Sequence, residues 1–193
     1  MKLKRISFSP FRRLKIIFVI IPLISACNWF EPREAEKPWE EESDWQEPVS
    51  PSVVISNLKL AFEGRNIVNY ASSFSPDFIF FGDPADSPYV EPGIFNDWNY
   101  EVEIDVTTKL FNTFNNIGLL FEDSTGDSTG TVGTFYKLYT LNLESSDSTV
   151  TVVGLARFQL AIDTTNLWSI VEWNDFRTDS IYIDWSILKA KSR

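Results

Sequence analysis

The chain has 193 residues and a formal net charge of −10, from 17 Lys and Arg against 27 Asp and Glu, which suits one domain and disfavours binding to nucleic acid. It contains no histidine and a single cysteine, Cys27, so nucleophile systems that need His and metal sites built on His or on several thiolates are excluded. Carboxylates, Tyr and Lys remain for proton transfer, and we expect no cofactor and no metal.

The first 27 residues have the layout of a bacterial secretory signal. Six basic residues and no acidic residue precede Cys27, and an apolar stretch covers residues 16–24. That stretch is shorter than the ~20 residues that a membrane-spanning helix needs, and Pro22 interrupts it. The alternatives are a chance thiol after an ordinary signal or membrane helix and, for the pair Arg12-Arg13, a twin-arginine export signal.

The four residues that end this segment, Ile24-Ser25-Ala26-Cys27, resemble the lipobox of bacterial lipoproteins. The resemblance implies removal of residues 1–26 and lipidation of Cys27, so that the membrane becomes a partner through the lipid. Two or more acyl chains anchor a protein stably, whereas one holds it only marginally. Asn28 stands where lipoproteins kept in the inner membrane commonly have Asp, which favours an outer-membrane location facing the periplasm.

Residues 27–49 are expected to form an acidic tether. Its last 22 residues contain eight acidic residues, three prolines and few aliphatic side chains, which is too little to build a core. Trp29, Trp39 and Trp45 either pack loosely on the domain or the membrane interface, or form a short motif that recruits a partner. Without residues 1–26 the chain has 167 residues, with 11 basic and 27 acidic side chains and a formal net charge of −16.

The folded domain is expected over residues 50–193 and begins with two helices. Ser50 is a good N-cap and Pro51 a good first residue for a helix that Gly64 ends. The apolar side chains of this helix share one face: Val54, Leu58, Ala61 and Phe62. The second helix is short, with a cap at Asn66, a stop at Pro76, and the side chains of Ile67, Tyr70 and Phe74.

A strand is expected over residues 77–81, and four prolines and glycines then indicate a long turn or irregular hairpin. Residues 94–111 have a near-helical spacing of apolar side chains and predict a third helix, with Phe95, Trp98, Val102, Val106 and Leu110 on its face. The strand-favouring residues 102–108 weaken that prediction.

The rest of the chain predicts a meander of four strands, at residues 117–121, 131–144, 150–162 and 167–177. Residues 185–188 would be a short terminal extension. Helices followed by an antiparallel meander make an α+β fold, in which a single sheet curls over the helices.

The order of elements and several local patterns resemble the nuclear transport factor two-like superfamily, the cone-shaped α+β fold shared with ketosteroid isomerases and polyketide cyclases. The patterns lie at Leu58–Phe62 with Tyr70, Phe74–Phe80, Trp98–Glu101 and Leu167–Asp175. The resemblance covers about residues 51–190 and implies N-terminal helices packed in the concave face of a strongly curved antiparallel sheet. It says little about activity, because this superfold hosts many functions.

In the enzymes of this superfamily an Asp base and a Tyr or a protonated Asp act inside the cone. Tyr70 and Asp77 lie in the corresponding general region, but no local motif fixes them, so no catalytic residue is carried over. Homodimers that pack sheet to sheet are frequent in the superfamily, and the mixed second faces of strands 131–144 and 167–177 suit one.

Seven residues are candidates for a pocket inside the cone: Tyr70, Trp98, Glu101, Tyr139, Arg157, Trp168 and Trp173. The aromatic side chains would line a hydrophobic ligand site or simply fill the core. Arg157 would bind an anion, pair with Glu101 inside the cone, or form a partly exposed salt bridge. Glu101 and Asp105 are one helical turn apart and would either act as paired carboxylates or form a solvated face.

The tetrapeptide Asp-Ser-Thr-Gly occurs twice in succession over residues 123–130. Oxygen-rich loops can hold calcium, but this segment lacks the spacing of the established calcium loops. Asp, Ser and Gly favour turns, so we expect a hairpin connection here.

These features favour a lipid-anchored cell-envelope protein with a non-enzymatic role, which binds a small apolar ligand or a protein partner. The alternative is a periplasm-facing isomerase, cyclase or hydrolase that uses carboxylates and Tyr in the cone. A third interpretation is an assembly factor whose tether recruits a partner. A packed interior without a buried carboxylate would exclude the enzyme, whereas an open pocket with Tyr70 or an Asp at its floor would favour it.

Overall fold

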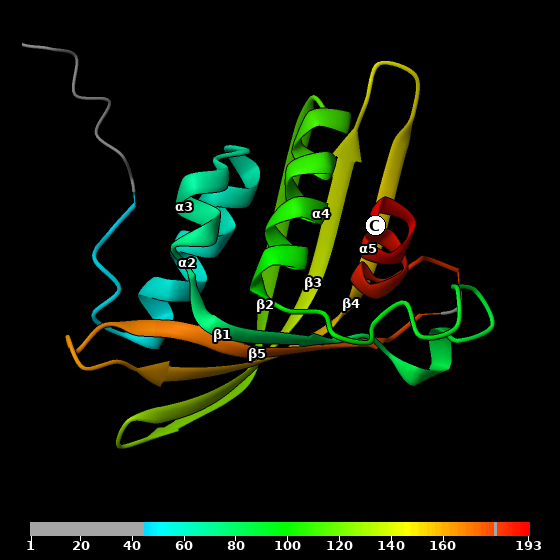
Figure 1. The fold of residues 1–193 in the computed structure, drawn as a ribbon. Coiled ribbons are helices and arrows are strands. Elements are labelled where there is room, and N and C mark those ends of the chain that lie inside the picture. The colour runs from blue at the N-terminus through cyan, green and yellow to red at the C-terminus, as the bar shows by residue number, and fades with distance from the viewer. Residues whose placement is uncertain (1–44, 180) are drawn as a thin grey trace, which may run out of the picture. The chain divides into compact units, whose positions relative to one another are not determined.

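The computed structural model describes residues 45–179 and 181–193. In chain order the elements are α2 (Pro51–Glu63), α3 (Ile67–Ala71), β1 (Phe74–Phe81), the short 3-10 helix η3 (Pro84–Asp86), α4 (Tyr100–Thr113), β2 (Asn116–Thr129), β3 (Val132–Glu144), β4 (Thr149–Ile162), β5 (Trp168–Arg177) and α5 (Trp185–Ser192). Figure 1 labels the α-helices and the strands. The predicted lipidation at Cys27, and the tether as far as residue 44, lie outside the described residues.

Polar side chains begin the helices. Asn66 accepts a hydrogen bond from the backbone N–H of Asn69 at 3.0 Å, and Asn99 accepts one from Val102 at 3.1 Å. Such caps satisfy a backbone donor that has no partner within the helix. The first predicted helix is confirmed. The second is present with its cap at Asn66, but it ends at Ala71 rather than at Pro76, and Phe74 and Pro76 belong to β1. The third begins at Tyr100 rather than at residue 94, because Asp97 takes a left-handed φ of 57° and Asn99 caps the helix after it.

One five-stranded sheet, in the order β1-β5-β4-β3-β2, forms the wall of the cone. The pairs β2–β3, β3–β4 and β4–β5 are antiparallel, as the meander predicted. β1 pairs with β5 in parallel, which the sequence did not indicate. The two strands are far apart in the chain, so no hairpin fixes their relative direction, and the sheet is mixed.

The β2–β3 hairpin is longer than predicted. Residues 123–129 continue β2 instead of forming a connection, and the chain turns at Gly130, which has a φ of 63°. Gly126 pairs with Phe135, and a Cβ at Gly126 would lie 2.3 Å from the Phe135 ring. Pairing with β3 therefore overrides the turn preference of the Asp-Ser-Thr-Gly repeat, and Gly126 leaves room for an aromatic ring.

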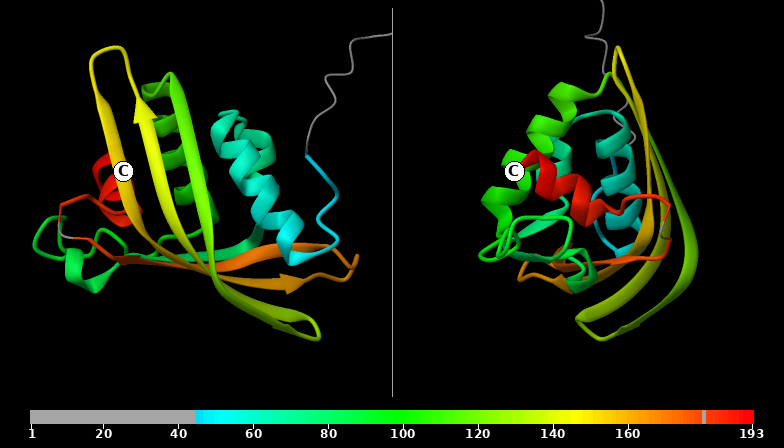
Figure 2. Two further views of the ribbon diagram at one scale, coloured as in Figure 1. Left: turned by 180° about the vertical axis from the view of Figure 1, so that it is seen from behind. Right: turned by 90° about the vertical axis from the view of Figure 1, so that its right-hand side faces the viewer.

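The core lies between the helices and the concave face of the sheet. Along β4, buried residues alternate with partly exposed ones from Val152 to Leu160, as the period-two pattern predicted. Figure 2 shows the long strands curving around the helices. The fold class, an α+β cone with helices in the concave face of a curved sheet, is confirmed.

The end of the chain is a helix inside the cone rather than a terminal extension. Trp185, Ser186, Ile187, Leu188 and Lys189 of α5 are all buried. The Trp185 ring packs on Phe62 at 5.0 Å and on Trp173 at 4.6 Å, measured between ring centroids. α5 thus joins the helical layer to the sheet.

Candidate functional site

Glu103, a buried carboxylate on α4, is the centre of a polar cluster inside the cone. The Tyr70 hydroxyl donates a hydrogen bond to its Oε1 at 2.6 Å, and the Trp98 indole N–H donates one to its Oε2 at 2.8 Å. The Nζ of Lys189 lies 2.8 Å from Oε1 and 3.0 Å from Oε2. These side chains are at most 1% exposed, so one cation and two neutral donors satisfy a carboxylate that has lost its water.

Lys189 lies between aromatic rings. Its Nζ is 3.5 Å from the ring centroid of Trp173 and 3.9 Å from that of Phe80, which favours the charged amine. Burial lowers the pKa of Lys189, and the charges of Glu103 and Asp175 oppose this effect. Burial and the charge of Glu103 raise the pKa of Tyr70 well above its ordinary value, so Tyr70 is a neutral donor.

Asp175 of β5 is the centre of a second set of buried hydrogen bonds. The Tyr139 hydroxyl donates to its Oδ1 at 2.8 Å, while the N–H and the hydroxyl of Ser186 donate to its Oδ2 at 2.7 and 3.0 Å. Burial, and then the charge of Asp184, raise the pKa of Asp175 to about 7. These bonds fasten the first turn of α5 to the sheet.

Three charged groups meet where the chain leaves β5. The guanidinium of Arg177 lies 2.5 Å from Oδ1 of Asp86 and 3.8 Å from Oδ2 of Asp184. Burial, and then the hydrogen bond and charge of Asp184, raise the pKa of Asp86 to about 8. One arginine therefore faces two buried carboxyl groups, and their repulsion is relieved when one of them holds a proton.

The structure brings five of the seven predicted pocket residues together. Tyr70, Trp98, Tyr139, Trp168 and Trp173 all belong to the buried core. Glu101 is exposed on α4, and Asp105 pairs with Lys109 at 2.8 Å instead of with Glu101. Arg157 lies on the outer face of the sheet and pairs with Glu172 at 2.5 Å, so it does not meet Glu101 inside the cone.

Three polar residues of the interior were missed by the sequence reasoning. Glu103 lies three and four residues before Val106 and Thr107 on the buried stripe of α4, and Asp175 is two residues after Trp173, on the same strand face. Helical and strand periodicity could have found both. Lys189 gave no comparable signal, because its helix is only eight residues long and amphipathicity is hard to read over two turns.

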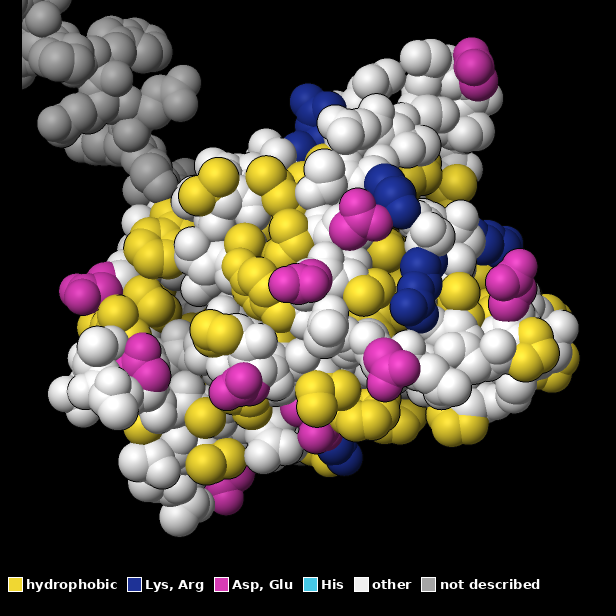
Figure 3. All heavy atoms as spheres, viewed as in Figure 1, with side chains coloured by type: hydrophobic (Ala, Val, Ile, Leu, Met, Phe, Trp, Pro, Cys, Tyr) yellow, Lys and Arg dark blue, Asp and Glu magenta, His cyan; other side chains and the backbone are white. Residues whose placement is uncertain are grey.

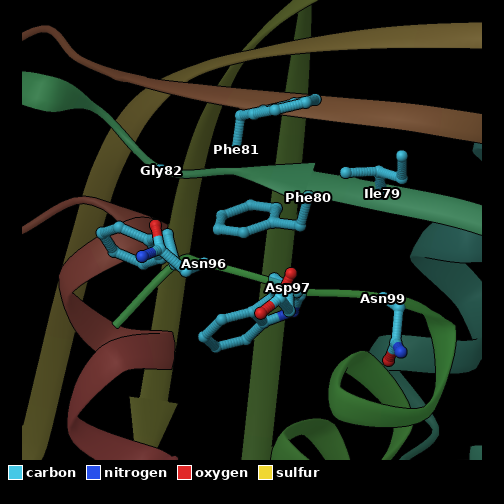
Figure 4. Close-up of a pocket in the computed structure, with 9 residues that line it drawn as sticks. Ile79, Phe80, Phe81, Gly82, Asn96, Asp97 and Asn99 are labelled. Atoms are coloured by element: carbon cyan, nitrogen blue, oxygen red, sulfur yellow. The ribbon is translucent and has the colours of Figure 1, made fainter. Parts of the chain in front are cut away.

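Outside the cone, a groove runs along the edge of β1 that faces residues 95–99; we call it the edge groove. Its larger part, a hollow of about 690 Å³, is lined by residues 79–82 and 95–99, as Figure 4 shows. A smaller hollow of about 160 Å³ continues it along residues 82–84 and 90–96, and the two share Gly82, Phe95 and Asn96. A Cβ at Gly82 would lie 2.5 Å from the Phe95 ring, so this glycine allows the ring to form the wall.

Comparison with known proteins places the fold. No protein-family model and no curated protein matches the sequence. Solved structures do match in three dimensions, and a nuclear transport factor two-like superfamily protein from Salmonella enterica superposes with a TM-score of 0.51. The chain has the nuclear transport factor two-like fold. That protein is 12% identical, and the match covers 66% of this chain and 89% of the other.

Two further structures show the breadth of the likeness. A protein from Planctomyces limnophilus is 10% identical, with a TM-score of 0.55 over 64% of this chain and 89% of its own. A hexachlorocyclohexane dehydrochlorinase is 9% identical, with a TM-score of 0.52 over 65% of this chain and 81% of its own. At such identities the likeness shows the fold alone.

The chemistry that the interior offers is proton exchange between Tyr, Lys and carboxyl groups. Within residues 45–179 and 181–193, no group of three or more Asp, Glu or Cys side chains is placed to hold a metal ion. No helix in the described part of the chain is long and apolar enough to cross a membrane. The interior groups bond to one another across α4, β5 and α5, whereas the edge groove is open to solvent.

Proposed function

We propose that this protein is a lipid-anchored module of the cell envelope that binds a partner, a small apolar ligand or a protein, on the outside of its cone. The observation that carries the proposal is the occupied interior: Trp185 and Lys189 of α5 fill the space between the helices and the sheet, each with 0% exposure. A substrate would have to displace that helix, whereas the edge groove is already open.

Anchoring is supported by the lipobox-like residues before Cys27 and by the acidic tether that would follow them. Metabolic labelling with an alkyne fatty acid should label the full chain and place it in the membrane fraction. Cys27→Ser should abolish the label, while Asn28→Ser, the neighbouring control, should keep it. A labelled Cys27→Ser variant, or an unlabelled parent chain, would contradict lipid anchoring there.

Binding is tested separately from anchoring. A photo-crosslinking amino acid placed at Phe81, which is 45% exposed beside the groove, should capture a partner in intact cells. The same group at Val68, which is 70% exposed on α3, is the matched control. Capture at Phe81 and not at Val68 would support binding through the groove side. Equal capture at both positions, or none at either, would count against it.

A second part of the proposal is a homodimer that packs sheet to sheet. On the outer face, Leu138, Leu155 and Phe176 lie in one row across β3, β4 and β5. Leu138 is 39% exposed, and such an apolar row on an open sheet suits contact with a second copy.

An enzymatic function is the second candidate, favoured by one observation. Asp175 has a pKa near 7 and lies beside the Tyr139 hydroxyl, which are groups suited to acid–base catalysis. Structures of the same fold include a dehydrochlorinase and a protein of unknown function. This candidate requires α5 to leave the cone. Protection of the Trp185 amide from hydrogen exchange, equal to that of the β4 amides, would contradict it.

A further inference from the structure

The edge groove lies where residues 95–99 stop pairing with β1, the edge strand of the sheet. β1 is the first strand in the sheet order, with β5 on one side. On its other side β1 meets residues 98–99 in an isolated antiparallel bridge between Ile79 and Asn99, and the Phe80 N–H donates to the Trp98 carbonyl at 3.0 Å. Asp97, with its left-handed φ, turns the preceding residues away, so the two backbones diverge beyond this bridge.

Apolar side chains border the open part of this edge. Ile79 is 47% exposed and Phe81 is 45% exposed, and they alternate along β1 with the buried ring of Phe80. Figure 4 shows Phe80 directed toward residues 96–99, below the strand. A strand edge with apolar neighbours is a template for pairing with another extended chain.

The charges along the groove are negative. Asp97 lines the larger hollow, and Asp83 and Glu91 line the smaller one; neither lining includes a Lys or Arg side chain. Of these, the Asp83 carboxylate already accepts hydrogen bonds from the N–H groups of Ala85 and Arg177. Two cations lie near the groove and already have partners. The guanidinium of Arg193 donates to the carbonyls of Ile94 and Asn96, and that of Arg177 pairs with Asp86.

The net charge of the whole protein is negative as well. The protein carries a formal net charge of −10, and Figure 3 shows acidic side chains scattered over the face that is viewed as in Figure 1. A neutral or acidic partner would gain nothing from this field, whereas a cationic one is attracted and oriented by it.

We propose that the edge groove binds an extended segment of a partner polypeptide in which an apolar side chain is flanked by Lys or Arg. The backbone of the segment pairs with the open part of this edge, beyond the bridge between Ile79 and Asn99. Its apolar side chain lies between Ile79 and Phe95, and its cations approach Asp97 and Glu91. The inference rests on the proposed binding function and specifies the chemistry of the partner.

The test uses the purified full-length protein in detergent and three fluorescent heptapeptides, with binding read by anisotropy. The first is Lys-Arg-Val-Phe-Val-Lys-Arg, the second replaces every cation by Glu, and the third replaces Phe by Ser. We expect the first peptide to bind at least about tenfold more tightly than either of the others, and to lose affinity as salt is raised. Equal binding of the acidic peptide would overturn the proposal.

Substitutions in the groove test whether the first peptide binds there. Asp97→Asn removes one charge and keeps a residue that tolerates a left-handed φ, and Ile79→Ser removes the apolar wall. Each should weaken the first peptide at least about fivefold, as expected for losing an ion pair or an apolar contact near 1 kcal/mol. The matched controls are Asp147→Asn in the turn between β3 and β4 and Val68→Ser on α3, both exposed, and they should leave affinity unchanged. Equal losses of affinity in the variants and the controls would contradict binding in the edge groove.

Different results would contradict the proposed binding function and the proposed binding of a cationic segment in the edge groove. If the Phe81 crosslinker captures a cellular partner but Asp97→Asn and Ile79→Ser do not weaken the cationic peptide, the groove chemistry is wrong while a binding role stands. If the first peptide fails to bind and vesicles of anionic or zwitterionic lipid protect residues 79–82 from hydrogen exchange, the groove meets a membrane and not a polypeptide. Either result would overturn the inference.

Discussion

At Glu103, a single buried carboxylate receives hydrogen bonds from Tyr70 and Trp98 and an ion pair from Lys189. Two charges without water are stable only when both are compensated, since the cost of desolvating each is several kcal/mol. The four side chains come from α3, the segment before α4, α4 itself and α5. One buried charge thus holds four parts of the chain in a single arrangement.

Removing one member of this pair should therefore cost more than removing both. We expect Lys189→Met to lower the free energy of unfolding by about 3–5 kcal/mol, because Glu103 is left without a cation. The double variant Glu103→Gln with Lys189→Met should recover at least half of the loss, since Gln still accepts from Tyr70 or Trp98. Urea denaturation of the three proteins measures this, and an additive double variant would contradict it.

The raised carboxyl pKa values predict a dependence of stability on pH. Asp175 and Asp86 hold their protons more tightly when folded, with pKa values of about 7 and about 8. Their stabilising effect is complete below the unfolded pKa of about 4 and is lost as pH rises through 7–8. For Asp175 alone, the loss between pH 4 and pH 8 should be on the order of 3 kcal/mol.

Asp175→Asn isolates this contribution, because Asn cannot titrate while its amide oxygen can still accept a hydrogen bond from Tyr139. Unfolding midpoints at pH 5, 6, 7 and 8 should fall less steeply with pH in the variant than in the parent chain. Parallel curves would show that Asp175 does not hold a raised pKa. Asp86 contributes to both curves and cancels in the comparison, because Asp175 is not among the groups that raise its pKa.

α5 is the element that decides what the cone can do. Eight residues long, it would not be a stable helix by itself in water. Its stability comes from the rings around Trp185 and from the cap at Asp184, whose carboxylate accepts from the N–H of Ile187 at 3.0 Å. The edge groove arises where a helix is missing rather than where one packs. Because α4 begins only at Tyr100, residues 94–99 form an irregular wall beside β1.

Trp185→Ala should cost about 3–5 kcal/mol of unfolding free energy, because the side chain is fully buried among aromatic rings and leaves a cavity. Lys191→Ala on the exposed side of the same helix should change it by less than about 0.5 kcal/mol. Thermal or chemical denaturation separates the two. A small loss of unfolding free energy in Trp185→Ala would show that α5 packs weakly in the cone. That result would favour the enzymatic function, which requires α5 to leave the cone.

The whole molecule presents two surfaces, the outer face of the sheet and the edge of β1. The proposed dimer uses the first, and the proposed cationic segment uses the second, so one copy could bind both partners. The outer face also carries the Arg157–Glu172 pair, at 2.5 Å. Partly exposed pairs of this kind contribute little to stability and more to the choice of partner.

Analytical ultracentrifugation checks the dimer. We expect the parent chain to sediment as a dimer at micromolar concentration, and Leu138→Glu to sediment as a monomer, because a charge would be buried at the centre of the interface. Val68→Glu on α3 is the control and should leave the dimer intact. A parent chain that remains monomeric at every concentration would contradict the sheet-to-sheet proposal.

Local sequence patterns predicted most helices and strands of the fold, but few residues of the candidate site. The caps at Ser50 and Asn66 and the alternation along β4 are short-range signals, so helices and strands could be placed from them. The start of α4 and the true length of β2 could not. The first follows from the left-handed φ of Asp97 and the bridge between Ile79 and Asn99, and the second from the pairing of Gly126 with Phe135 across the hairpin.

The amino-acid sequence by itself determined the α+β order, the absence of histidine chemistry and the lipobox-like motif at Cys27, because each is a property of composition or of neighbouring residues. The tertiary structure alone decided that the cone is filled, that Lys189 meets Glu103, and that a groove opens beside β1. Lys189 and Glu103 are 86 residues apart, and no local pattern encodes a contact made at that separation.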